Sequence, residues 1–212
     1  MANLRRLALE MQHADDLDAA QQRWTERLEA LHTLGVRLVE HGAALVVACD
    51  VVVTISRSAA VRSLVEGVAS RGWCGRVVVL DGTVSGRGRD QAAALYEAGL
   101  DVRSLPDGAM LEAFDEPASS GLIVVGADAV SSRRFVNAQG TRLLLEVGEA
   151  LGVRRVVVAD SGKDVREADL NAVLTGSRRH WEQGPGRQWP VFEAIPRRLV
   201  DHRVSEGGCV SW

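Results

Sequence analysis

The N-terminal part of the chain carries a helical pattern of apolar positions. From Leu4 to about His41, large apolar side chains recur at spacings of three and four residues among charged ones, as on one face of an amphipathic helix. Gly35 interrupts the pattern, and we expect two helices here with a break near that residue. Residues 1–45 are therefore predicted to form a short helical arm that covers the core or a second subunit.

From Ala43 onward, short apolar runs alternate with helix-like segments. The runs rich in β-branched residues are 51–55, 76–80, 101–105, 122–126 and 154–159. Continuous apolar runs of this length are typical of strands buried on both faces, as in a parallel sheet. The segments between them have helical patterns: SAAVRSLVEGVASRG, RDQAAALYEAG, GAMLEAFDE and TRLLLEVGEALG. This alternation predicts an α/β domain over 46–212, Rossmann-like and doubly wound, with a mainly parallel sheet and right-handed crossovers.

Composition narrows the functional classes. The chain has 212 residues, 46% of them hydrophobic, and a formal net charge of -3, so nucleic acid is an improbable partner. No run approaches the roughly 20 apolar residues that span a bilayer, and we expect a cytoplasmic protein without membrane contact. The three cysteines form no CxxC pair and the histidines no HExxH motif, which argues against a metal centre.

Polar residues follow every predicted strand. Ser56 and Arg57 follow the first, Asp81 the second, Asp107 the third, Asp128 the fourth, and Asp160 and Lys163 the fifth. In an open parallel sheet, ligands bind beyond the carboxyl ends of the strands. The same residue types also cap helices at this edge, so capping remains an alternative for each aspartate.

The loop GTVSGRGR after the second run is glycine-rich. It lacks both the GxGxxG fingerprint and the Walker pattern, so no dinucleotide or nucleoside triphosphate cofactor is expected. Gly82, Gly86 and Gly88 could let backbone amides approach an anion, with Arg87 or Arg89 adding charge. A plain surface loop is the alternative.

Motifs along the chain stand in a familiar order: VVVTISRSAAVRSLVEG, VVVLDGTVSGRGRDQAAALYEAGLDVRSLPDGAM, IVVGADAVSSRRFVNAQGT, VVVADSGK and PVFEAIPRRLVDHRVSEGG. With these motifs, the chain from about Val51 to Gly207 resembles the superfamily that joins translation initiation factor 2B alpha, beta and delta subunits with methylthioribose-1-phosphate isomerase and ribose-1,5-bisphosphate isomerase. The resemblance implies a Rossmann-like fold and a homodimer or other homo-oligomer.

The resemblance also implies roles for single residues. Asp128, in the GAD motif, matches the acid/base aspartate of the isomerases, and Ser56 stands where they have a catalytic cysteine. Asn137, Gly140 and Thr141 match the asparagine and helix start that hold the substrate. The full set of expected substrate-binding residues is Arg57, Asp81, Gly86, Arg87, Gly88, Asn137, Gly140, Thr141 and Lys163.

The chain departs from the isomerase pattern at several of these positions. Ser56 replaces the cysteine, and a serine hydroxyl is a poorer proton donor or nucleophile without an adjacent base. Asp81, Thr83 and Ala138 replace a glutamate, an arginine and a lysine of the family. Two interpretations stay open: a diverged aldose–ketose isomerase that binds a small phosphorylated metabolite, or a non-catalytic ligand-binding or assembly protein like the initiation factor subunits.

Overall fold

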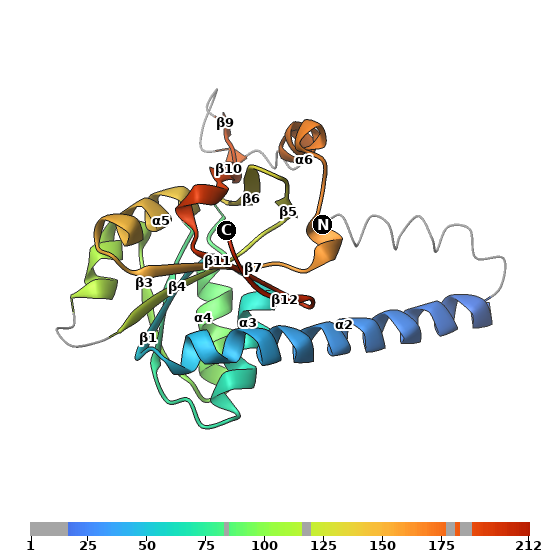
Figure 1. Cartoon of the computed structure of the whole chain (residues 1–212), viewed down its shortest axis with the longest axis horizontal. Helices are drawn as coiled ribbons and strands as arrows, with labels where there is room; N and C mark the ends of the chain where they lie inside the picture. Colours follow the sequence, from blue (N-terminus) through green and yellow to red (C-terminus); the bar gives the residue numbers. More distant parts are fainter. Residues whose placement is uncertain (1–16, 83–84, 116–119, 177–180, 183–187) are drawn as a thin grey trace.

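A seven-stranded sheet forms the centre of the molecule (Figure 1). The computed structural model describes residues 17–82, 85–115, 120–176, 181–182 and 188–212. The strand order is β12-β11-β7-β4-β1-β2-β3. The strands are β1 (Val51–Ile55), β2 (Arg76–Leu80), β3 (Asp101–Leu105), β4 (Gly121–Gly126), β7 (Arg154–Val158), β11 (His202–Ser205) and β12 (Gly208–Ser211).

All neighbouring strands of this sheet are parallel except the β11–β12 pair. If the parallel strands are numbered 1 to 6 in chain order, their order across the sheet is 3-2-1-4-5-6. This is the arrangement of the doubly wound Rossmann fold. The order reverses between β1 and β4. The predicted fold class is confirmed, and the five predicted strands agree with the observed ones to within one residue.

Helices cover both faces of the sheet (Figure 1). One face packs against α2 (Leu17–Val47), α3 (Ala59–Ala69) and α4 (Gly88–Glu97). The other packs against η1 (Asp107–Phe114), α5 (Thr141–Ala150) and η4 (Arg197–Leu199). Successive strand residues point to opposite faces, so Val52 belongs to the first core and Val53 to the second. Burial on both faces explains why the strands are apolar without alternation.

The N-terminal helix is continuous, which corrects the expected break at Gly35. Helix α2 runs uninterrupted from Leu17 to Val47. A glycine inside a helix costs only about 1 kcal/mol, and burial of Leu38 and Val46 in the core beyond it offsets that cost. Residues 1–16, where part of the helical pattern lies, are outside the described residues, and the division of the chain at residue 45 stays a prediction.

Helix α2 packs closely on α3 along its C-terminal half. A Cβ added to Gly67 would lie 2.4 Å from a methyl carbon of Val39, so this helix pair needs glycine at its contact. The N-terminal half of α2 extends beyond the edge of the sheet (Figure 1). Leu28 and Leu31 on this half are exposed.

Several smaller elements differ from the sequence-based expectation. The segment expected as a helix at GAMLEAFDE is the 3-10 helix η1, kinked at Ala109, where φ is -101° and ψ is 17°. A second, antiparallel sheet joins β10 (Phe192–Pro196), β6 (Arg134–Ala138) and β5 (Ala129–Val130). The remaining elements are η2 (Ser161–Lys163), η3 (Glu167–Asp169), α6 (Leu170–Gly176), β8 (Trp181–Glu182) and β9 (Gln188–Trp189).

The described helices include none that is both long enough and apolar enough to cross a membrane. Across the same part of the chain, no three potential metal ligands of the His, Cys, Asp or Glu type come together. The thiol of Cys49 is buried, and this burial, with a smaller effect from Asp50, raises its pKa to about 12. Cys74 and Cys209 are exposed.

Candidate functional site

A cavity of about 390 Å³ lies at the carboxyl edge of the sheet, where the strand order reverses. The turns after β1, β4 and β7 contribute its charged side chains, and α2 contributes apolar side chains. Ligand sites in doubly wound sheets occur at this kind of crevice. The lining residues are Leu31, Leu34, Gly35, Leu38, Arg57, Ser58, Ala59, Ala60, Ser63, Ala127, Asp128, Asn137, Val158, Ala159, Asp160 and Lys163.

Four charged side chains of this cavity lack partners among the described residues. The guanidinium of Arg57, the ammonium of Lys163 and the carboxylates of Asp128 and Asp160 make no ion pair or hydrogen bond with the described part of the chain. The backbone amide of Asp128 donates to the carbonyl of Val136 at 2.8 Å, which fixes the turn that presents its side chain. Unpaired charges in a concave site are available to bind a polar ligand.

Asn137 is the neutral polar side chain of the cavity that comes from β6. It is 8% exposed, and its Nδ2 donates to Thr141 Oγ1 at 3.1 Å. Thr141 Oγ1 in turn donates to the carbonyl of Ala138 at 2.7 Å. Because a side-chain amide has two N–H groups and one oxygen, Asn137 keeps one donor and one acceptor for a ligand while Thr141 orients it.

The turn after β1 is shaped by two small residues. Ser58 is the N-cap of α3, and its Oγ accepts from the amide of Val61 at 3.3 Å. A Cβ added to Gly126, at the end of β4, would lie 2.3 Å from Ser58 Oγ. Glycine at position 126 thus lets the ends of β1 and β4 approach each other. This approach places Arg57 and Asp128 in the lining of one cavity.

Ser56 is turned away from this cavity. It is 5% exposed, and its Oγ lies 3.2 Å from Ser85 Oγ on the glycine-rich loop. Its φ is 60°, the only positive φ of a non-glycine residue in the described chain. Such a backbone costs about 1–3 kcal/mol and is found at functional sites more often than elsewhere. Of the two expected catalytic residues, Asp128 lines this cavity and Ser56 does not.

Four described backbone amides of the glycine-rich loop are hydrogen-bonded within the protein. Gly82 donates to Asp107 Oδ1 at 2.8 Å, and the amides of Ser85 and Gly86 both donate to the carbonyl of Gly82 at 2.8 Å. The amide of Gly88 donates to the carbonyl of Asp81 at 2.8 Å. These amides already have acceptors, so an anion would have to displace them; Thr83 lies outside the described residues.

The side chain of Asp81 is also engaged in the protein. It pairs with Arg89 at 3.1 Å and accepts from Ser104 Oγ at 3.2 Å. Arg87 is the N-cap residue of α4. Asp81, Gly86, Arg87 and Gly88 all lie outside the lining of the cavity, and contact between any of them and a ligand stays a prediction.

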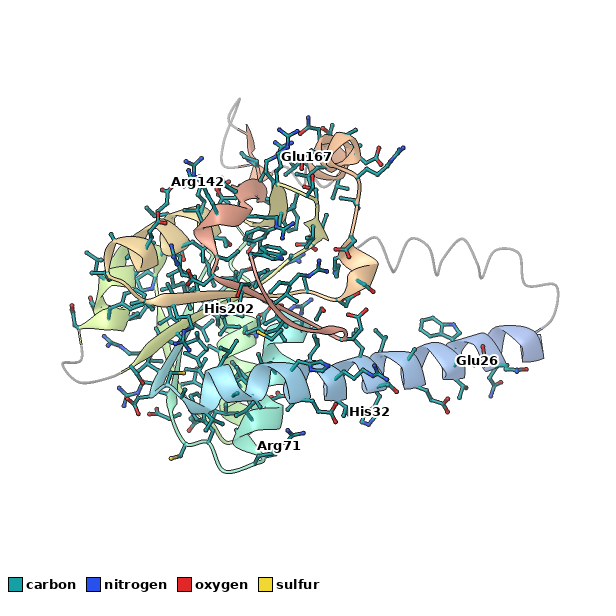
Figure 2. The ribbon with its side chains drawn as sticks, in the orientation of Figure 1. Glu26, His32, Arg71, Arg142, Glu167 and His202 are labelled. Atoms are coloured by element: carbon teal, nitrogen blue, oxygen red, sulfur yellow. The ribbon has the colours of Figure 1, made fainter. Side chains whose placement is uncertain are left out.

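Gly140 and Thr141 do not line this cavity. Thr141 is fully buried, and Gly140, with φ of 96°, precedes α5. Gly140 lines a separate cavity of about 480 Å³ with Asp107, Arg142 and Glu193. Figure 2 shows Arg142 on α5, across the sheet from α2. Of the expected site residues, the structure thus brings together Arg57, Asp128, Asn137 and Lys163.

The structure adds residues that the sequence-based list does not contain. Asp160 lies two residues after the end of β7 and could have been chosen by the same rule that selected Lys163. The apolar part of the lining, which includes Leu31 and Leu34 on α2, had only a helical spacing as its signal. That spacing predicts an apolar face of the helix. Only the tertiary structure shows that part of this face borders the cavity.

A model of the initiation factor 2 subunit family matches residues 3–211 of the chain. The chain belongs to this family. A Pyrococcus furiosus protein named as an eIF-2B subunit 2-like translation initiation factor is 26% identical over 211 residues, which are 99% of this chain and 75% of that protein. A methylthioribose-1-phosphate isomerase of Alkalilimnicola ehrlichii is 29% identical over 218 residues, which cover 94% of this chain and 59% of the isomerase.

Solved structures share the fold of this family member. The translation initiation factor eIF-2B of Pyrococcus horikoshii OT3 has a TM-score of 0.81 at 24% identity, over 100% of this chain and 76% of that one. The 5-methylthioribose 1-phosphate isomerase of the same organism has a TM-score of 0.73 at 21% identity, over 98% and 65% of the two chains. The relatives of this chain thus include proteins named as initiation factors and as isomerases.

Proposed function

We propose that the cavity at the β1, β4 and β7 ends binds a small phosphorylated sugar or nucleotide. The observation that carries this proposal is the presence of two cations, Arg57 and Lys163, in one cavity with Asp128 and Asn137; neither cation has a partner among the described residues. Arginine and lysine bind phosphate through charge-assisted hydrogen bonds. Asn137 and the two aspartates supply acceptors and a donor that suit sugar hydroxyls.

The catalytic form of the proposal is an aldose–ketose isomerisation. A carboxylate can take the proton from C2 of an aldose phosphate and return it to C1. The O2 hydroxyl proton moves to O1 in an open-chain aldose or, in a 1-phosphate, to the ring oxygen O4 as the C1–O4 bond breaks. We assign the C2 proton to Asp128. The resemblance to the isomerases gives Ser56 the second role, but Asp160 and Lys163 line the cavity with Asp128 whereas Ser56 does not.

The second candidate function is ligand binding or assembly without turnover, as in the relatives named as initiation factors. The orientation of the Ser56 side chain favours this second function. Its hydroxyl lies against Ser85 rather than in the cavity, and no described base is hydrogen-bonded to it that would activate it. In this form of the proposal, Asp128 and Asp160 accept hydrogen bonds from ligand hydroxyls and move no proton between carbons.

Proton exchange separates the two functions. The full chain is incubated in D₂O with ribose-1,5-bisphosphate, methylthioribose-1-phosphate and ribose 5-phosphate, and loss of the C2 proton is followed by NMR. Exchange with one of them supports the isomerase, and thermal stabilisation without exchange supports binding alone. Adenosine 5′-monophosphate completes the stabilisation series as a nucleotide. If none of the four ligands stabilises the protein and none of the three sugar phosphates exchanges, the binding proposal itself is wrong.

Filling the cavity from α2 is expected to weaken binding. Gly35 lines the cavity, and the nearest atom to a Cβ built there is Ser63 Oγ at 3.9 Å. We expect Gly35→Leu to lower the affinity for the best ligand of that series by about ten-fold or more, because the leucine occupies ligand volume. Isothermal titration calorimetry measures the change.

Two controls accompany the Gly35 variant. Gly35→Ala adds one methyl group and should strengthen the helix by about 1 kcal/mol while leaving affinity nearly unchanged. Ala30→Leu adds the leucine side chain to an exposed position of the same helix, outside the cavity lining. Equal affinities of Gly35→Leu and Ala30→Leu would show that the ligand does not use this part of the cavity.

A further inference from the structure

Two charged residues of the cavity lie on one short loop. Asp160 and Lys163 follow β7 in a single turn of 3-10 helix. Inside the loop, the amide of Lys163 donates to the carbonyl of Asp160 at 3.1 Å and that of Asp164 to the carbonyl of Ser161 at 3.0 Å. A single turn of this kind has little stability by itself. Its position must come from contacts with other elements.

Arg203, on the neighbouring strand β11, contacts three residues of this loop. Its Nε donates to the carbonyl of Ala159 at 3.1 Å, and its Nη2 donates to the carbonyl of Asp160 at 3.0 Å. Its Nη1 lies 2.7 Å from a carboxylate oxygen of Asp164. The side chain is only 12% exposed, and the ring of Trp212 lies 5.8 Å from its guanidinium carbon. Every guanidinium nitrogen of Arg203 is thus directed at the loop.

Glu206, just after β11, contacts the same loop at Ser161. Its carboxylate accepts from the Ser161 amide at 3.0 Å and from the Ser161 hydroxyl. Burial raises the pKa of Glu206, but the hydrogen bonds from Ser161 and the charge of Arg203 outweigh it, so the pKa is lowered overall. The loop is therefore held at the end of β11 by one cation, Arg203, and one anion, Glu206.

We propose that Arg203 is a positioning residue, which sets the place of Lys163 and Asp160 in the cavity by holding the β7–η2 loop. This inference rests on the proposed function, in which Lys163 binds the phosphate of a ligand. Arg203 does not itself line the cavity, and its nitrogens are engaged with the loop. It acts on the ligand through the residues that the loop carries.

Arg155 provides a matched control for this proposal. Its side chain is also 12% exposed, and it forms an ion pair with Asp201 at 2.8 Å. It lies at the start of β7, at the opposite end of the strand from the cavity. Arg203→Met and Arg155→Met each remove one buried guanidinium from the sheet, so both should lower the melting temperature. Only Arg203→Met should change the cavity.

The first measurement does not depend on the ligand. Hydrogen–deuterium exchange of the full chain should become faster at residues 161–165 in Arg203→Met and stay unchanged there in Arg155→Met. Arg203→Lys keeps the charge but loses the three-point contact, so it should restore only part of the protection. Unchanged exchange of this loop in Arg203→Met would overturn the proposal, whether or not the protein binds a phosphorylated ligand.

The second measurement is a double-mutant cycle between Arg203 and Lys163, with affinity for ribose-1,5-bisphosphate as the readout. Arg203→Met should weaken binding by about ten-fold, as expected for a lost charge-assisted contact of Lys163. Arg155→Met should not. In the Lys163→Met background, most of the effect of Arg203→Met should vanish, because the two changes remove the same contact. Fully additive effects would overturn the proposal; absence of binding in the unmodified protein would instead count against the proposed function.

Discussion

Replacing Asp128 by asparagine is expected to reduce exchange of the C2 proton of a bound sugar phosphate by at least about 100-fold. Asparagine has nearly the same shape as aspartate but cannot accept a proton at the pH of the assay. The carboxylate lines the cavity and makes no ion pair within the described chain. Its replacement therefore removes the proposed base without breaking a contact that holds the fold.

Binding should survive the Asp128→Asn change, since Arg57 and Lys163 remain to hold the phosphate. Removing one negative charge from the cavity should leave the affinity equal or higher, which calorimetry can measure beside the NMR exchange rate. Asp90→Asn, an exposed carboxylate on α4, is the control for a general charge effect. An exchange rate in Asp128→Asn equal to that of the unmodified protein would exclude Asp128 as the base.

Gly88→Ala is expected to lower the free energy of unfolding by about 3 kcal/mol or more. Helix α4 begins almost on the end of β2, and a Cβ at Gly88 would lie 2.1 Å from the carbonyl oxygen of Leu80. Both clashing groups are backbone, and β2 is held between β1 and β3 by its ladder hydrogen bonds. Relief of the clash must therefore move the helix or break the hydrogen bond from Gly88 to Asp81.

Urea unfolding followed by circular dichroism measures this effect. Gly108→Ala is the control, because a Cβ there meets no atom within 4 Å and should change stability by no more than about 0.5 kcal/mol. The two variants also separate two roles for Gly88. A Gly88→Ala protein of normal stability that had lost ligand affinity would support the anion-binding role expected from the sequence and would contradict the packing role.

The strands and the candidate site differ in how far sequence could predict them. The runs at 51–55, 76–80 and 121–126 are strands because both their faces are buried, which leaves an uninterrupted apolar signal. Polar residues directly after such strands share one edge of a parallel sheet as a matter of geometry. For this reason Arg57, Asp128 and Lys163, chosen by position alone, were found in one cavity.

Side-chain direction at the same edge could not be predicted. Ser56 and Arg57 are adjacent in sequence, yet only Arg57 lines the cavity, because Ser56 has a left-handed backbone that turns it toward Ser85. No pattern in the residues signals that conformation, since serine adopts it rarely. For the glycine-rich loop, the sequence left anion binding and a plain surface loop open. In the structure, the amides of Gly82, Ser85, Gly86 and Gly88 are hydrogen-bonded to acceptors in Gly82, Asp81 and Asp107.

The alternation of buried strands and amphipathic helices follows from the local sequence, and with it the doubly wound sheet and the edge that carries polar residues. These features can be predicted locally, because the periodicity of burial depends on residues that are neighbours in the sequence. The tertiary structure decided which of those residues share a cavity, that α2 completes its lining, and that Arg203 on β11 holds the loop of Lys163. These are contacts between segments far apart in the chain, which depend on packing distances that no local pattern contains.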